Sequence, residues 1–198
     1  SEANVVTDSK DQQLTIFYPG AAAWSKKYTR RIHIIIHRLS KELAFAHIAP
    51  NDRHFMLACI DACRKNRVSY FFDPGQAMSL FSTGELRHII KNAFGLFLNE
   101  YELGLLEKTL KLPSQKIAKL CGIMVVTLGE KGSDMYFQNK VIHIPSRKPA
   151  VIKDPTGCGD AYRAGFLAEI QHEFPKLTPG RAAARLSKQC ISIAILER

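Results

Sequence analysis

Residues 154–166 read Asp-Pro-Thr-Gly-Cys-Gly-Asp-Ala-Tyr-Arg-Ala-Gly-Phe. Two glycines, Gly157 and Gly159, stand just before a helical pattern that we expect over 161–172. Glycines at such a turn let backbone N–H groups converge, and the N-terminus of a helix adds a partial positive charge. The segment therefore predicts an anion site at the start of a helix.

Asp160 falls in the first turn of this expected helix, beside the anion site. A carboxylate there can accept a proton from an attacking hydroxyl while the backbone amides stabilise a transferring phosphoryl group. The simpler interpretation is a well-capped helix, because acidic residues are common in a first helical turn. The length of the whole motif favours the chemical interpretation over the capping one.

The rest of the chain alternates strand-like apolar runs with helical patterns, which is typical of a parallel sheet covered by helices. Polar residues follow the strands at the sheet edge where such folds bind ligands. The sequence therefore predicts a three-layer α-β-α, Rossmann-like fold with a mostly parallel sheet. Strands are expected at 14–17, 45–48, 68–72, 94–98 and 123–128, followed by a hairpin with arms at 135–138 and 141–144. Helices are expected after Asp52 and Ser82, from Leu103, from Ser114, after Asp160 and after Pro179. The stretch 24–42 is ambiguous.

Two further motifs follow expected strands. Asn99 and Glu102 form an Asn-x-x-Glu pattern after an apolar run, and Thr127, Gly129 and Gly132 form a Thr-x-Gly-x-x-Gly turn. Each has an ordinary interpretation, since Asn and Glu at this spacing also cap helices and glycines also make plain turns. Their shared position at strand ends is what suggests a common site.

The three motifs, in this order, resemble those of the ribokinase-like (PfkB) family of carbohydrate and nucleoside kinases. The segment at 154–160 resembles the family signature Asp-Thr-x-Gly-Ala-Gly-Asp, with Cys158 in place of the usual alanine. The resemblance implies a ribokinase-like core and transfer of the γ-phosphate of ATP to a sugar or nucleoside hydroxyl, with Mg²⁺ as cofactor and K⁺ as a further cation.

Residue roles follow from the same resemblance. It implies that Asp160 is the general base and that Gly157, Cys158 and Gly159 form the anion hole. It further implies nucleotide binding by Asn99, Thr127, Gly129 and Gly132, a water-mediated Mg²⁺ contact from Glu102, and a monovalent-cation site at Asp154 and Thr156.

The chain is shorter than a complete member of this family, and by the resemblance it lacks the substrate-binding N-terminal part. We therefore expect residues 1–198 to form a single, partial ribokinase-like domain, truncated at its N-terminus, which contains the nucleotide-binding portion. Uncovered sheet edges and apolar faces favour self-association or pairing with another chain, and a homo-oligomer is the form we expect.

Composition excludes few functions. The formal net charge of +10 suits phosphorylated ligands, nucleic acid or anionic surfaces. Residues 24–31 contain Trp24, Tyr28 and four basic residues, which we interpret as a solvated helix face and not as a nucleic-acid patch. No apolar run is long enough to span a membrane, and the N-terminus is unlike a secretory signal, so we expect a cytoplasmic protein with reduced cysteines.

Three functions remain open on these grounds. The first is a kinase of the adenosine-kinase or sugar-kinase type. The second is a truncated, non-catalytic remnant that binds nucleotide or a protein partner. The third is a basic nucleic-acid-binding module, which only the net charge favours. Four histidines lack ligand spacing and are interpreted as solvated or satisfied in the core: His33, His37, His47 and His143.

Overall fold

A six-stranded sheet is the centre of the structure, a computed structural model that describes residues 2–7, 13–18, 20, 27–146 and 157–173. Four strands are parallel, and the last two are antiparallel. This arrangement confirms the predicted mostly parallel sheet. In spatial order the strands are β3 (Ala46–Ile48), β4 (Tyr70–Phe72), β5 (Gly95–Asn99), β6 (Ile123–Thr127), β7 (Ser133–Phe137) and β8 (Lys140–Ile144).

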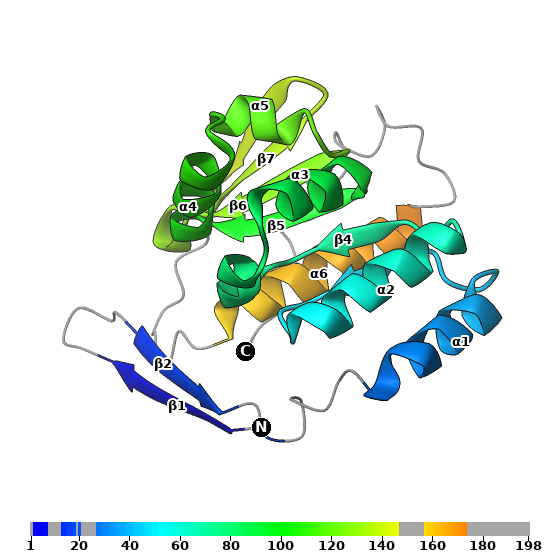
Figure 1. Cartoon of the computed structure of the whole chain (residues 1–198). Helices are drawn as coiled ribbons and strands as arrows, with labels where there is room; N and C mark the ends of the chain where they lie inside the picture. Colours follow the sequence, from blue (N-terminus) through cyan, green and yellow to red (C-terminus); the bar gives the residue numbers. More distant parts are fainter. Residues whose placement is uncertain (1, 8–12, 19, 21–26, 147–156, 174–198) are drawn as a thin grey trace.

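Helices cover both faces of the sheet and complete three layers (Figure 1). One face packs against four helices and the other against α6. The helices of the first face are α2 (Arg53–Lys65), α3 (Thr83–Asn92), α4 (Glu100–Leu110) and α5 (Ser114–Ala118), and α6 spans Cys158–Glu173. Two 3₁₀ turns, Gly75–Leu80 and Gly129–Lys131, follow β4 and β6.

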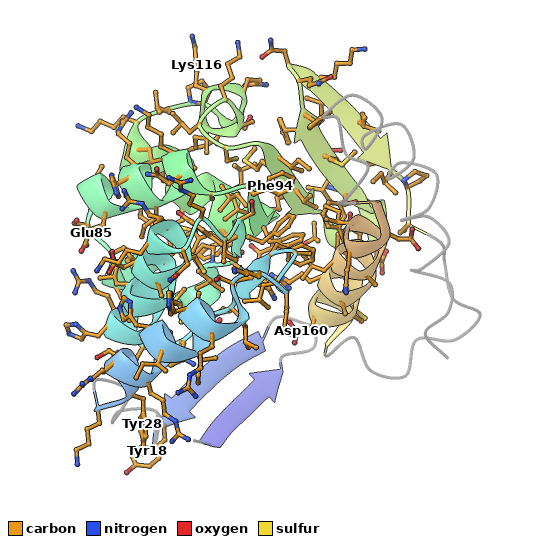
Figure 2. The ribbon with its side chains drawn as sticks, turned by 90° about the vertical axis from the view of Figure 1, so that its right-hand side faces the viewer. Tyr18, Tyr28, Glu85, Phe94, Lys116 and Asp160 are labelled. Atoms are coloured by element: carbon orange, nitrogen blue, oxygen red, sulfur yellow. The ribbon has the colours of Figure 1, made fainter. Side chains whose placement is uncertain are left out.

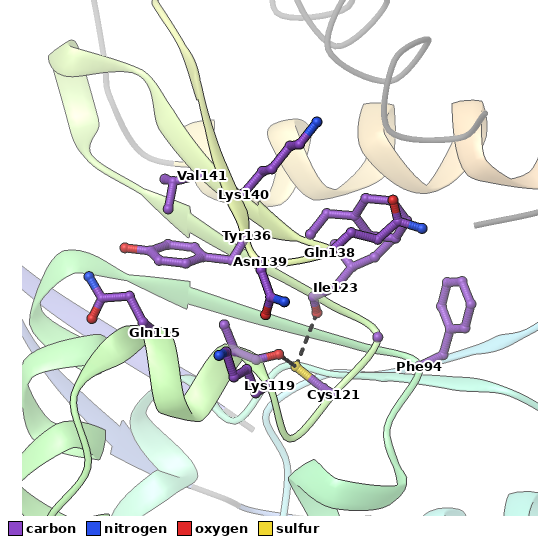
Figure 3. Close-up of a pocket in the computed structure, with 13 residues that line it drawn as sticks. Phe94, Gln115, Lys119, Cys121, Ile123, Tyr136, Gln138, Asn139, Lys140 and Val141 are labelled. Atoms are coloured by element: carbon purple, nitrogen blue, oxygen red, sulfur yellow. Dashed lines mark hydrogen bonds between the residues drawn. The ribbon is translucent and has the colours of Figure 1, made fainter. Parts of the chain in front are cut away.

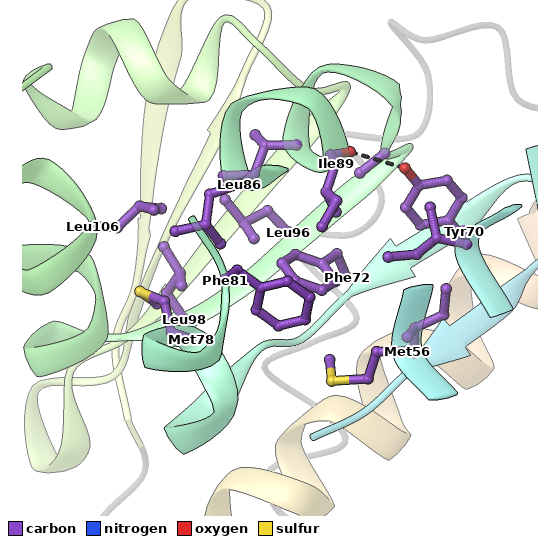
Figure 4. Close-up of a cluster of buried hydrophobic side chains, with 14 of the residues drawn as sticks. Met56, Tyr70, Phe72, Met78, Phe81, Leu86, Ile89, Leu96, Leu98 and Leu106 are labelled. Carbon is purple, nitrogen blue, oxygen red and sulfur yellow. Dashed lines mark hydrogen bonds between the residues drawn. The ribbon is translucent and has the colours of Figure 1, made fainter. Parts of the chain in front are cut away.

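Alternating side chains of β4 divide the core into two clusters. Tyr70 and Phe72 point to the face of α2 and α3 (Figure 4), whereas Phe71 points to the face of α6. The buried Tyr70 hydroxyl donates a hydrogen bond of 2.8 Å to the carbonyl of Ile89. On the other face the ring of Phe166 from α6 packs edge-on against Phe97. This period of two is what a strand buried on both faces requires.

The starts of α2 and α3 agree with the predicted caps, whereas α4 begins at Glu100, before the expected Leu103, because Asn99 caps it. Asp52 accepts hydrogen bonds from the backbone of His54 and Phe55 at the start of α2. Ser82 and Glu85 form a reciprocal capping box at the start of α3. The last helix begins at Cys158, three residues before the predicted start, because Gly157 accepts the first helical hydrogen bond from Ala161. The helix expected after Pro179 lies outside the described residues.

The N-terminal part contains an antiparallel pair of strands, β1 (Glu2–Thr7) and β2 (Gln13–Tyr18). This pair lies apart from the main sheet, on the side where α6 begins (Figures 1 and 2). β2 was predicted and β1 was not. The ambiguous stretch contains α1 (Thr29–Leu39), which packs on α2 and leaves Arg30 and Arg31 exposed, as a solvated face requires.

No helix within the described residues is long and apolar enough to cross a membrane. Four cysteines in this part of the chain are free thiols, Cys59, Cys63, Cys121 and Cys158.

Candidate active site

The ends of β5 and β6 bring two predicted residues side by side. Asn99 and Thr127 are the last residues of these parallel strands and are paired in register. The Thr127 hydroxyl lies 3.5 Å from the carbonyl oxygen of Leu98. The structure thus places both residues at the carboxyl edge of the sheet, where folds of this class bind ligands.

Glu102 lies in the first turn of α4 and is joined to Asn99 by a capping box. The Glu102 amide donates to Asn99 Oδ1 over 2.7 Å, and the Asn99 amide donates to Glu102 Oε2 over 2.9 Å. The side chain is buried, with 9% exposure. This burial is the main reason why the pKa of Glu102 is raised above its ordinary value, and the nearby Asp73 raises the pKa further.

Asp73 follows β4 and is the residue at this edge that sequence reasoning missed. Its amide donates to the carbonyl of Ile48 over 3.0 Å, and its side chain is buried. One carboxylate oxygen lies 3.3 Å from His47 Nε2. The same carboxylate binds Arg163 from α6 through contacts of 2.5 Å to Nε and 3.3 Å to Nη2.

Arg163 connects this buried carboxylate to the predicted base. Its Nη1 atom lies 3.6 Å from Asp160 Oδ1, one turn earlier on α6. The Asp160 side chain is 90% exposed and lies at the end of α6 that faces the β1–β2 pair (Figure 2). The Nε atom of Arg163 meets Asp73 as an ion pair and not as an aligned hydrogen bond.

The first turn of α6 has the geometry of an anion site. Gly157 has a φ of +86°, a conformation that glycine adopts without strain. Since the first helical hydrogen bond runs from Ala161 to Gly157, the amides of Cys158, Gly159 and Asp160 have no acceptor within the helix. They are available to an anion next to the Asp160 carboxylate.

The glycine loop after β6 is tied to α6. Gly132 has a φ of +99°, and a side chain there would collide with the backbone of Ile144 and Ser146, so this position requires glycine. Gly129 has a φ of +59° and open space around it. The next residue, Ser133, is buried, and its hydroxyl lies 2.8 Å from the Tyr162 hydroxyl of α6. The loop and the helix that carries Asp160 are therefore held together.

The predicted residues thus form a connected group with a few exceptions. Asn99 is hydrogen-bonded to Glu102, whose pKa responds to the charges of Asp73 and Arg163. Arg163 in turn contacts both Asp73 and Asp160. Thr127, Gly129 and Gly132 lie along the adjacent strand end and loop. Asp154 and Thr156 lie outside the described residues. Sequence reasoning missed His47, Asp73 and Arg163, although the spacing of Arg163 three residues after Asp160 on a helix was a usable signal.

The donor set suits a divalent cation brought by a nucleotide. Within the described ranges no three His, Cys, Asp or Glu side chains gather to hold a metal directly. Glu102 is nevertheless a buried carboxyl, and burial raises its pKa. Mg²⁺ commonly keeps several waters and takes few protein oxygens together with phosphates, so Glu102 and Asp73 fit a water-mediated role.

A hollow of about 580 Å³ lies at the other end of the sheet (Figure 3). It is lined by residues from the start of β6, from α5 and from the β7–β8 turn, among them Lys119, Ile123 and Tyr136. Cys121 at its edge donates to the Ile123 carbonyl, and burial raises the pKa of this thiol to about 12. None of the predicted site residues that the structure describes borders this hollow, so the hollow is separate from the described part of the candidate active site.

Comparison with known proteins gives the same family as the motifs. The model of the pfkB family of carbohydrate kinases matches residues 2–197. The chain belongs to the PfkB family. This PfkB-family chain is 35% identical over 168 residues to a nucleoside kinase of Methanocaldococcus jannaschii, an alignment that covers 84% of this chain and 52% of the relative.

Solved structures support the family fold of this PfkB-family chain. A Burkholderia thailandensis nucleoside kinase in complex with inosine matches with a TM-score of 0.81 and 28% identity, over 98% of this chain and 59% of that one. The crystal structure of the Methanocaldococcus jannaschii nucleoside kinase matches with a TM-score of 0.71 and 31% identity, over 97% and 57%. The chain spans about half the length of the curated relatives it matches. The predicted family and ribokinase-like fold are confirmed.

Proposed function

We propose that this chain is the nucleotide-binding portion, including the base, of a kinase that transfers the γ-phosphate of ATP to a nucleoside or sugar hydroxyl. The observation that carries the proposal is the first turn of α6, where the exposed Asp160 carboxylate stands beside three backbone amides that have no acceptor within the helix. A base and a stabiliser of developing negative charge are the two groups that this reaction needs.

In the proposed reaction Asp160 accepts the proton of the acceptor hydroxyl as its oxygen attacks the γ-phosphorus. A new oxygen–phosphorus bond forms, the bond to the β-phosphate oxygen breaks, and ADP leaves. The amides of Cys158, Gly159 and Asp160 stabilise the charge on the transferring group. Mg²⁺ bound to the phosphates would neutralise their charge, with Glu102 placed to contact its waters.

The nucleotide would bind along the strand ends, with Asn99, Thr127, Gly129 and Gly132 at its phosphates and ribose. Support comes from the common edge of Asn99 and Thr127 and from the open space around Gly129, where the backbone is accessible to a ligand. We infer that K⁺ binds at Asp154 and Thr156, as the family signature implies, and that residues 1–198 form one partial domain.

A nucleoside is the favoured acceptor. The similar proteins include nucleoside kinases at 35% and 31% identity, and the Burkholderia thailandensis enzyme has been solved with inosine and with ADP–inosine. The β1–β2 pair on the Asp160 side of the molecule could cover an acceptor bound there. Excluding water from the transferring group would strengthen the electrostatic stabilisation that catalysis requires.

The experiment is a phosphorylation assay with Mg·ATP and a panel of nucleosides and sugars. We expect inosine or a related nucleoside to be phosphorylated, and Asp160→Asn to lower kcat about 10²- to 10⁴-fold, the usual contribution of a general base. Glu169→Gln is the matched control, because it removes one negative charge from the same helix far from the first turn.

A second candidate function is a non-catalytic remnant that binds nucleotide or a protein partner, which is favoured by the coverage of only about half of the relatives' length. ATP binding without transfer to any acceptor would support the remnant. Equal activity of the wild type and Asp160→Asn would instead contradict the proposed base.

A further inference from the structure

The proposed function brings two negative charges together at the first turn of α6. A phosphoryl group held by the amides of this turn would lie next to the Asp160 carboxylate, and both are negative. Like charges a few ångströms apart repel strongly wherever the surroundings screen them less than bulk water does. Mg²⁺ on the phosphates would offset part of this repulsion, and a cation of the chain itself close to Asp160 would offset more of it.

Arg163 is fixed at this position by a buried partner. Asp73, with 2% exposure, holds its guanidinium through contacts to Nε and Nη2. These contacts occupy one edge of the guanidinium and leave Nη1 directed toward Asp160, 3.6 Å away. An exposed ion pair alone contributes little, but here the arginine is already ordered by the buried contact, so its charge stays in place.

Gly159 provides an independent observation. A Cβ atom at this position would lie 2.8 Å from Nη1 of Arg163. The guanidinium therefore lies against the backbone of the same turn whose amides form the anion site. Glycine at position 159 leaves room for the charge to approach the site this closely, and any side chain would push Arg163 away from it.

We propose that Arg163 is a positioning residue of the phosphoryl site: held by Asp73 and seated on Gly159, it offsets the Asp160 charge and so permits the γ-phosphate to bind beside the base. The inference rests on the proposed function. It predicts that Arg163 contributes more to the binding affinity for ATP than to that for ADP, because ADP lacks the phosphoryl group that lies next to Asp160.

The test is calorimetric titration of the chain with Mg·ATP and with Mg·ADP, in the absence of acceptor. We expect Arg163→Met to weaken ATP binding roughly tenfold, with a much smaller effect on ADP. Adding Asp160→Asn to Arg163→Met removes the uncompensated charge and should restore most of the ATP affinity. A purely structural defect would not be rescued in this way.

Loss of Arg163 leaves the buried Asp73 carboxylate with His47 but without its charged arginine partner, and a buried charge that loses such a partner destabilises a folded protein. The double variant Asp73→Asn/Arg163→Met removes both charges and serves as the folding-competent alternative, with circular dichroism and thermal melting as checks. It should show the same selective loss of ATP affinity. Arg53→Met is the matched control, because Arg53 pairs with Glu85 between α2 and α3 and should not change the ATP-to-ADP ratio.

The inference would be overturned if both Arg163 variants kept the wild-type ratio of ATP affinity to ADP affinity. It would also be overturned if adding Asp160→Asn to Arg163→Met failed to restore ATP binding. Either result would leave the proposed kinase function intact if the wild type transfers phosphate to an acceptor in the phosphorylation assay. Absence of ATP binding in the folded wild type would overturn the proposed function together with this inference.

Discussion

Glu102 and Asp160 are carboxylates of the same candidate site in opposite environments. Asp160 is exposed at the first turn of α6 and can exchange a proton with a bound hydroxyl. Glu102 is buried behind it, with one oxygen occupied by the Asn99 amide. The two environments fit the different tasks proposed for these groups, a base at the surface and a buried carboxylate beside a hydrated cation.

Glu102→Gln should raise the melting temperature of the unliganded chain at pH 7. Burial raises the pKa of Glu102, so the folded state binds this proton more tightly than the unfolded state does. Stability from Glu102 is therefore greatest below the ordinary glutamate pKa and falls as the pH rises through the raised value. Glutamine can still accept the Asn99 amide and avoids this loss.

Thermal melts between pH 4 and pH 8 test the direction of this pH dependence of stability. The melting curves of wild type and Glu102→Gln should converge toward pH 4 and separate toward pH 8. Glu107→Gln, on the same helix, is a useful comparison, although its carboxylate accepts the Ser114 amide. A wild type more stable than Glu102→Gln at pH 8 would contradict the argument.

Local motifs reveal some residues of the site from the sequence and hide others. Asp160, Asn99 and Glu102 belong to short patterns whose spacing carries the prediction. Asp73 belongs to an Asp-Pro-Gly turn that ends many strands, so nothing local distinguishes it. Its partner Arg163 is 90 residues away in the sequence, and only the assembly of β4 and α6 brings the two together.

At the scale of elements, α3 and α4 begin with equivalent capping boxes. Ser82 and Glu85 cap α3, and Asn99 and Glu102 cap α4. Only the second box lies at the candidate site. Ser82→Ala and Asn99→Ala should each lower the free energy of unfolding by about 1 kcal/mol, because each removes the side-chain acceptor of a helix N-terminus. Urea denaturation measures both losses.

Nucleotide binding should separate these two variants. Asn99→Ala should weaken Mg·ATP binding, whereas Ser82→Ala should leave the affinity unchanged at a temperature where both are folded. This difference assigns a binding role to Asn99 beyond its cap. Equal affinities for ATP in the two variants would reduce Asn99 to a capping residue.

The elements themselves were largely predictable because their hydrophobic periods agree with their caps. The exceptions are informative. β1 has only two adjacent valines as an apolar signal and becomes a strand by pairing along its whole length with β2. α1 places three arginines and two histidines among its apolar residues and contains no buried residue, and its packing on α2 identifies it.

At the scale of the whole molecule, the sheet topology explains why distant motifs form one site. The carboxyl ends of the parallel strands β4, β5 and β6 all lie at one end of the sheet. The helix α6, which covers the face opposite to α2, α3, α4 and α5, starts at this same end. Asp73, Asn99 and Thr127 are thus brought near Asp160 without any local signal between them. The amino ends of the strands, with the 580 Å³ hollow, contain none of these residues.

The molecule also exposes apolar surface that favours association with a second copy. Ile34, Ile35 and Leu39 of α1 are all at least 40% exposed, and the three-residue strand β3 is an edge of the described sheet. Uncovered edges and clustered apolar side chains promote pairing between chains. We expect the average mass in sedimentation or light-scattering experiments to rise with protein concentration.

Ile35→Lys should shift this association toward the monomer, because a charge at the centre of the α1 surface must be desolvated in any contact that covers it. Tyr101→Lys is the matched control, since Tyr101 is a large exposed side chain on α4, away from α1. Its association should equal that of the wild type. If Ile35→Lys associates as strongly as Tyr101→Lys, the contact between chains does not use α1. A wild type that stays monomeric at every concentration would contradict self-association itself.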